Sequence, residues 1–160
     1  MTLQTNIPGQ LKSMKLVYWA MAVAQVILGT ASYVLVATNT LGEPDYTLAI
    51  MFQQVALIFV PLMMAIGYFL FRYQLSRIDP KLALESKLKR YFALILVRAA
   101  LFEFAFFFCC VATLVTHVLL FLWIAPVVFF VFLLLRPTPE GISTDLQLSS
   151  GDSNKLGRDS

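Results

Sequence analysis

Four long apolar runs separated by short polar segments dominate the pattern of this chain. They cover residues 16–37, 48–71, 91–115 and 117–135. A helix needs roughly 17 to 25 mostly apolar residues to cross the hydrocarbon core of a bilayer, which is about 30 Å thick. The pattern therefore predicts an all-α integral membrane protein with four transmembrane helices, arranged as two tandem helical hairpins in one bundle.

The composition agrees with this fold and argues against an ordinary soluble domain. Hydrophobic residues make up 59% of the 160 residues, charged residues make up 13%, and the mean hydropathy is +0.79. About a quarter of the residues are charged in a typical soluble domain. The lipid bilayer is therefore an expected partner of the chain.

The distribution of basic residues predicts the orientation. The loop at residues 38–47 has no Lys or Arg and carries Glu43 and Asp45. The segments before the first run, after the second and after the fourth hold Lys12, Lys15, Arg72, Arg77, Lys81, Lys87, Lys89, Arg90, Arg136, Lys155 and Arg158. By the positive-inside rule both termini are cytoplasmic. No nucleic-acid partner is expected, because the basic residues are segregated by membrane side and form no groove-sized patch.

The same pattern divides the chain into three parts. Residues 1–15 form a cytoplasmic N-terminal segment, residues 16–136 the transmembrane domain, and residues 137–160 a flexible cytoplasmic tail in which a short helix can start near residues 138–140. Asp79 followed by Pro80 predicts a helix N-terminus well before the third apolar run.

Arg98 and Glu103 are the ionisable residues inside the third run. Each costs about 2.5 to 3.5 kcal/mol at the centre of a membrane helix, so each needs a reason to be there. They lie about 140° apart around a helix and do not form the usual pair of residues four apart. Counted from Tyr91, Arg98 is expected about 10 Å deep and Glu103 about 18 Å deep, near the midplane.

The other apolar runs offer polar partners at matching depths. Gln25 is expected to face Arg98, whereas Thr30 and the carbonyl freed by Pro61 are expected to face Glu103. Arg98, Glu103, Gln25 and Thr30 are therefore candidates for ion binding or for pairing within the membrane.

Small and polar residues also define helix faces. Ala22, Gln25, Gly29 and Ser32 recur at three- and four-residue steps and predict a stripe along which another helix packs closely. On the second run Gln54 shares a face with Pro61 and is a further pairing candidate. Helix kinks are expected at Pro61 and Pro126, because proline lacks the amide hydrogen that the helix needs.

The two cysteines and the single histidine do not indicate a chemical site. Cys109 and Cys110 are adjacent on a predicted helix and point about 100° apart, so they do not bridge each other. His117 has no converging acidic residue or second histidine. No metal site, no cofactor and no enzymatic activity are therefore expected.

An internal repeat links the two halves of the chain. A shift of 73 residues aligns Tyr91-Phe92-Ala93 with Tyr18-Trp19-Ala20 and Arg98 with Gln25, and a shift of 65 residues aligns Pro126 with Pro61. This alignment predicts a duplicated hairpin, with parallel repeats about the membrane normal, in which the first and third spans face each other.

Two family resemblances accompany these motifs. The tandem hairpins and the stretch Arg98-Ala-Ala-Leu-Phe-Glu103 resemble the duplicated rotor-ring proteolipids of rotary ATPases, which implies an ion-binding carboxylate at Glu103. In that family, however, the carboxylate lies on the second helix of a hairpin and the termini face outward. The stretches Leu135-Arg136-Pro137-Thr138 and 145–148 are similar to uncharacterised four-helix membrane proteins of Bacteroidota, which implies a multi-pass protein of the bacterial inner membrane.

Three functions remain open from the sequence. The charged residues can serve assembly, which makes the chain an accessory subunit that pairs with other membrane subunits or in a homo-oligomer. Alternatively, Glu103 binds a proton or cation in a small transporter or ion-translocating subunit, with Arg98 tuning it. The third possibility is that both charges only fix how the helices of a structural bundle align with one another.

Overall fold

The computed structural model describes residues 7–38, 40–79, 82–146 and 148 and is all-helical over those residues. Its helices are α1 (Ile7–Ala37), α2 (Tyr46–Leu75), α3 (Leu84–Thr116), α4 (Leu120–Leu134) and α5 (Pro139–Asp145). Helices α1, α2 and α3 are long and apolar enough to cross a membrane, whereas α4 has 15 residues. The expected helical bundle is therefore present over the described residues, with three helices long and apolar enough to cross a membrane and one shorter helix.

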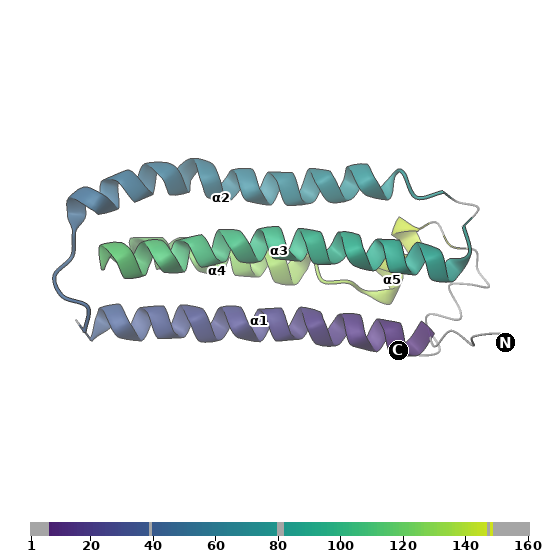
Figure 1. Cartoon of the computed structure of the whole chain (residues 1–160), viewed down its shortest axis with the longest axis horizontal. Coiled ribbons are helices and arrows are strands. Elements are labelled where there is room, and N and C mark those ends of the chain that lie inside the picture. The colour runs from purple at the N-terminus through teal and green to yellow at the C-terminus, as the bar shows by residue number, and fades with distance from the viewer. Residues whose placement is uncertain (1–6, 39, 80–81, 147, 149–160) are drawn as a thin grey trace.

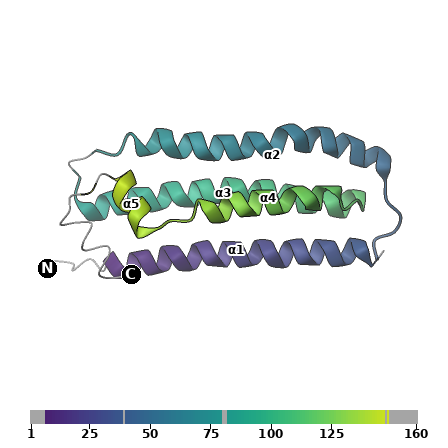
Figure 2. The same ribbon diagram turned by 180° about the vertical axis from the view of Figure 1, so that it is seen from behind.

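Helix α3 lies at the centre of the bundle. Figures 1 and 2 show α1 and α2 on either side of it, with α4 alongside it. Helix α3 packs against α1, α2 and α4, and α1 packs against both α3 and α4. The packing of the first predicted span against the third is thus confirmed, but α3 also carries α2 and α4.

The two ends of the bundle differ. Helices α1 and α3 start at one end and α2 finishes there, whereas α4 runs toward that end but stops short of it (Figure 1). The short helix α5 crosses this end, which we call the α5 end. At the opposite end the backbone N–H of Asp45 donates to the carbonyl of Thr116 at 3.0 Å, and the Nδ1 atom of His117 lies 3.0 Å from the carbonyl oxygen of Glu43. His117 adopts a left-handed conformation (φ 55°) that ends α3 and reverses the chain into α4.

The buried and exposed faces follow the helical period. The stripe on α1 is buried as predicted, with Ala22 and Gln25 each 2% exposed and Ser32 1% exposed. In contrast, Leu16 on α1 is 71% exposed and Leu57 on α2 is 77% exposed. Large apolar side chains facing outward along whole helices are the arrangement that a lipid environment favours.

Several helix boundaries differ from the expectations. Helix α1 begins at Ile7, inside the segment assigned to residues 1–15. Helix α3 begins at Leu84 after an N-cap residue, Ala83, that makes no side-chain capping bond. The predicted start at Pro80 is therefore wrong, because a turn closed by the N–H of Leu82 and the carbonyl of Asp79 precedes the helix. Pro80 itself lies outside the described residues.

The remaining local expectations concern α5 and the prolines. The short helix expected at residues 138–140 is α5, whose N-cap residue Thr138 accepts a hydrogen bond from the N–H of Gly141 at 3.1 Å. The tail expected to be flexible falls outside the described residues from residue 149 onward. Helices α2 and α4 continue through Pro61 and Pro126, and α2 is bowed along its length (Figure 1).

Candidate functional site

Arg98 is 8% exposed and is held inside the bundle by two contacts. Its Nη2 atom donates a hydrogen bond to the carbonyl of Leu135 at 2.6 Å. Its Cζ atom lies 4.1 Å from the centroid of the Phe71 ring, in the geometry of a cation–π contact. The guanidinium thus joins the middle of α3 to the end of α4 and to α2.

The last carbonyls of α4 are satisfied by side chains from other helices. The final turn of any helix leaves carbonyl oxygens without amide partners. The hydroxyl of Tyr18 donates to the carbonyl of Phe132, and the two rings stack with centroids 4.3 Å apart. Arg98 satisfies the carbonyl of Leu135 and also places a positive charge at the negative end of the helix dipole.

Asp145 ties α5 to this region. One carboxylate oxygen accepts a hydrogen bond from the hydroxyl of Tyr91 at 2.9 Å, and the other lies 4.0 Å from the Nη1 atom of Arg72. The Arg72 side chain is 60% exposed, so this ion pair contributes little by itself. Asp145 also interacts electrostatically with Arg98. We call Tyr18, Arg72, Tyr91, Arg98 and Asp145 the polar layer.

The expected pairing of Arg98 with Gln25 does not form. Both polar atoms of the Gln25 side chain are buried without a hydrogen-bond partner among the described residues. The physical reason is direction: side chains on a helix lean toward its N-terminus, and the long arginine stem carries its charge toward the end of the bundle. Arg98 therefore reaches the end of α4, and Gln25 is left without it.

Glu103 has no hydrogen bond or ion pair within the described part of the chain, and it is half-buried. Leu101 faces α2, because a Cβ placed on Gly67 would meet the Cβ of Leu101 at 3.5 Å. Glu103 follows two residues later and points about 200° away from Leu101. It therefore faces away from α2.

The other candidate partners lie elsewhere. Thr30 is exposed and lines a cavity against α4. Pro61 and Gln54 are on exposed faces of α2. The set of pairs expected for Glu103 is thus not assembled by the bundle.

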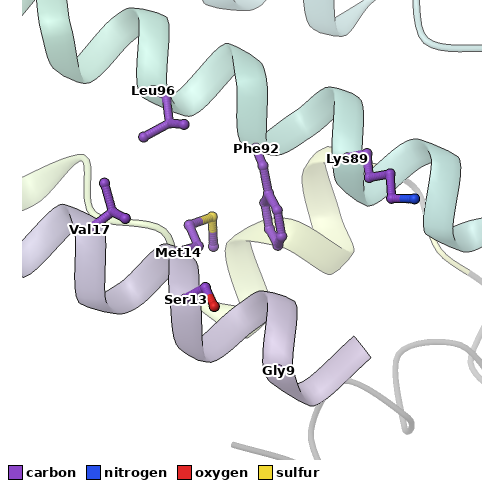
Figure 3. Close-up of a pocket in the computed structure, with 7 residues that line it drawn as sticks. All are labelled: Gly9, Ser13, Met14, Val17, Lys89, Phe92 and Leu96. Atoms are coloured by element: carbon purple, nitrogen blue, oxygen red, sulfur yellow. The ribbon is translucent and has the colours of Figure 1, made fainter. Parts of the chain in front are cut away.

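A groove between α1 and α3 opens near the α5 end (Figure 3). It has a volume of about 640 Å³ and is lined by Gly9, Ser13, Met14, Val17, Lys89, Phe92 and Leu96. Figure 3 shows Phe92 and Leu96 projecting from α3 toward α1. Glu103 comes seven residues after Leu96 and so lies on the same face of α3, further from the α5 end. The unpartnered carboxylate therefore continues the line of this groove.

The end of α4 gives a level from which depth can be measured. Arg98 binds the carbonyl of Leu135, the residue after the last residue of α4. Glu103 lies five residues further along α3, about 7.5 Å deeper. The Arg98 side chain thus reaches the end of α4, and Glu103 lies further along α3, toward the His117 end. The depths of about 10 Å and 18 Å in the membrane stay predictions.

Of the polar layer, the sequence marks only Arg98 as a candidate site residue. Tyr18 and Tyr91 stand out in the sequence only through the internal repeat, Arg72 only as a basic loop residue, and Asp145 only as part of the tail. The helical spacing already places Tyr91 beside Arg98, because Tyr91 precedes Arg98 by seven residues and so lies on the same face of the helix. No local signal places Asp145 beside them, because that contact joins residues 54 positions apart.

Cys109 and Cys110 are both fully buried free cysteines. Across the part of the chain that the structure describes, no group of three or more His, Cys, Asp or Glu side chains is placed to hold a metal ion. A comparison of the chain with protein-family models, with curated proteins and with solved structures finds no match in any of the three.

Proposed function

We propose that this chain is an accessory or assembly subunit of a complex in the bacterial inner membrane. In this proposal α4 crosses the membrane as a fourth, short span, and both termini face the cytoplasm. The observation that carries the proposal is that Glu103 has no partner within the described bundle and lies in line with an apolar groove. The two charged residues therefore have separate roles, with Arg98 used inside the fold.

The partner is argued from charge and shape. A carboxylate on the side of a membrane helix is stabilised when a neighbouring helix brings a cation or a strong hydrogen-bond donor to it. The groove between α1 and α3 has room for side chains of such a helix, and Phe92 and Leu96 offer it an apolar wall. The proposed partner is a transmembrane helix that carries a Lys or Arg at the depth of Glu103.

The test is purification of the tagged full chain from native membranes in a mild detergent, followed by native mass measurement. The wild type and Glu43→Gln are expected to retain the same partner or second copy, because Glu43 is an exposed loop residue. Glu103→Gln is expected to lose most of it. The same monomeric mass for all three proteins would overturn the assembly role.

A second candidate function rests on the same carboxylate. A half-buried, unpaired Glu103 can also be the proton or cation site of a small transporter or ion-translocating subunit. In that case dicyclohexylcarbodiimide modifies Glu103 in intact native membranes, and one particular cation suppresses the modification. In an assembly role the residue is shielded in the complex and becomes reactive only after the subunits are separated.

A further inference from the structure

Two arginines line one pocket between α2 and α3, near the α5 end. The pocket has a volume of about 410 Å³, and its lining residues include Tyr73, Arg77, Ile78, Arg90, Ala93 and Leu94. Arg77 comes just after the end of α2, and Arg90 lies in the second turn of α3. The pocket therefore brings together one positive charge from the end of α2 and one from the beginning of α3.

The Arg77 guanidinium is held over the Tyr73 ring. Its Cζ atom lies 4.4 Å from the ring centroid, and its Nη2 atom donates a hydrogen bond to the Tyr73 hydroxyl. A guanidinium has five N–H donors, so most of them stay available to an anion after this contact has formed. The planar group is positioned before any ligand binds, which reduces the side-chain entropy that binding costs.

Arg90 is exposed, and its side chain forms no hydrogen bond or ion pair with another described residue. Among the described residues that line this pocket there is no Asp or Glu. A neighbouring pocket, which Ile78 also lines, differs in this respect, because its Arg72 lies 4.0 Å from the carboxylate of Asp145. The pocket with Arg77 and Arg90 thus presents two positive charges without a carboxylate to neutralise them.

The surface beside the pocket favours a ligand with a hydrocarbon chain. Arg90 immediately precedes the third apolar run, so the pocket lies at the boundary between polar and apolar surface. One turn further along α3, Val97 shares a face with Ala93 and is 45% exposed. One turn before Tyr73 on α2, Phe69 is 67% exposed. A hydrocarbon chain can therefore lie along α2 and α3 while its headgroup stays at the arginines.

We propose that this pocket binds the phosphate of an anionic phospholipid whose headgroup carries no amine, such as phosphatidylglycerol. The planar guanidinium matches the geometry of phosphate oxygens and forms paired hydrogen bonds with them. Basic pockets between transmembrane helices are suited to anionic headgroups, which lie at this level of a bilayer. The ammonium group of phosphatidylethanolamine adds a third positive charge beside Arg77 and Arg90, and like charges repel. The site therefore prefers the lipid without an amine.

The test is photolabelling of the full-length protein in phosphatidylcholine nanodiscs. The probe is a phosphatidylglycerol with a diazirine near the start of one acyl chain, and labelled peptides are mapped by mass spectrometry. Labelling is expected on peptides that contain Phe69 or Val97. Unlabelled phosphatidylglycerol is expected to suppress it at a several-fold lower concentration than phosphatidylethanolamine with the same acyl chains. Equal suppression by the two lipids would overturn the proposal.

Three substitutions locate the preference. Arg77→Gln and Arg90→Gln are each expected to reduce the preference for phosphatidylglycerol at these peptides, and the double variant is expected to remove it. Lys12→Gln removes one exposed charge from α1 and is expected to leave the preference unchanged. A preference that persists in the double variant, or that falls equally in Lys12→Gln, would contradict binding at this pocket.

Loss of binding is separated from loss of folding by thermal unfolding in lipid-free detergent. Both arginines are exposed, so Arg77→Gln and Arg90→Gln are expected to unfold at the wild-type temperature. Their effect on labelling then reports on the lipid and not on the fold.

Free phosphate is the other source of the same chemistry. Inorganic phosphate is added at the concentration at which phosphatidylglycerol halves the labelling. It is expected to have no effect, because it lacks the chain that packs along Phe69 and Val97. Suppression as strong as that by phosphatidylglycerol would assign the pocket to a soluble anion and overturn the lipid proposal.

Discussion

At the scale of single residues, the location of Arg98 illustrates how a charge becomes tolerable in an apolar bundle. Its guanidinium satisfies a carbonyl at the end of α4 and stacks on the Phe71 ring. Both partners belong to the same chain. The charge therefore stabilises the fold locally and does not require another subunit.

We expect Arg98→Leu to lower the folded stability by about 1 to 3 kcal/mol, because the carbonyl of Leu135 is left without a donor. Arg98→Lys retains a charge but loses the planar contact with Phe71, so an intermediate loss is expected. Thermal unfolding in detergent measures both. Arg90→Leu is the control, since Arg90 is exposed. A loss no larger than that of the control would refute the structural role of Arg98.

Tyr18 gives a sharper test of a single hydrogen bond. Tyr18→Phe keeps the stacking on Phe132 and removes only the hydroxyl that donates to its carbonyl. A loss of about 1 kcal/mol is expected. Tyr33→Phe, at a residue that is 52% exposed, is the matched control and should unfold at the wild-type temperature.

At the scale of elements, α5 is the part of the fold that the sequence predicts least well. Its existence follows from the Thr138 cap, which is a local signal. Its docking does not, because Asp145 reaches Tyr91 and Arg72 across the bundle. The long helices were foreseeable from length and hydropathy alone, since each spans one uninterrupted apolar run.

The same distinction applies to the candidate site. Arg98 and Glu103 stand out by composition, because an ionisable residue in an apolar run is conspicuous. Their partners depend on side-chain direction and on which helix lies on which side of α3. Gln25 was expected to pair with Arg98 because the two residues lie at the same depth along their helices. Depth alone does not show which of the neighbouring helices the arginine side chain contacts. Whether the hairpins are a true duplication, and whether the two family resemblances hold, stays a prediction.

For α5 we expect Asp145→Ala to release the helix from the bundle. The amide protons of residues 140–146 should then exchange faster with solvent, whereas those in the middle of α3 should be unaffected. Hydrogen exchange with mass spectrometry measures this. Glu140→Ala changes an exposed residue of the same helix and should leave the exchange as it is. Unchanged exchange in Asp145→Ala would show that other contacts hold α5.

At the scale of the whole molecule, the predicted orientation in the membrane, with both termini in the cytoplasm, can be tested by labelling. Both native cysteines are fully buried, so a cysteine introduced at the surface can be labelled selectively. With a membrane-impermeant maleimide on intact cells, Glu43→Cys is expected to be labelled from outside. Ser86→Cys, at the α5 end, should be labelled only after the membrane is opened. The reverse result would invert the orientation and the assignment of the cytoplasmic end.

Helix α4 has one more consequence for the molecule as a whole. Its 15 residues span about 22 Å, about 8 Å less than the hydrocarbon core of a typical bilayer. A short span is accommodated when lipids near it compress, at a cost of fractions of a kcal/mol per Å of mismatch. The longer α1 and α2 impose no such compression. If α4 crosses the membrane as proposed, the bilayer is expected to be thinner on the α4 side, which makes this chain a local source of membrane asymmetry and draws it toward short-chain lipids.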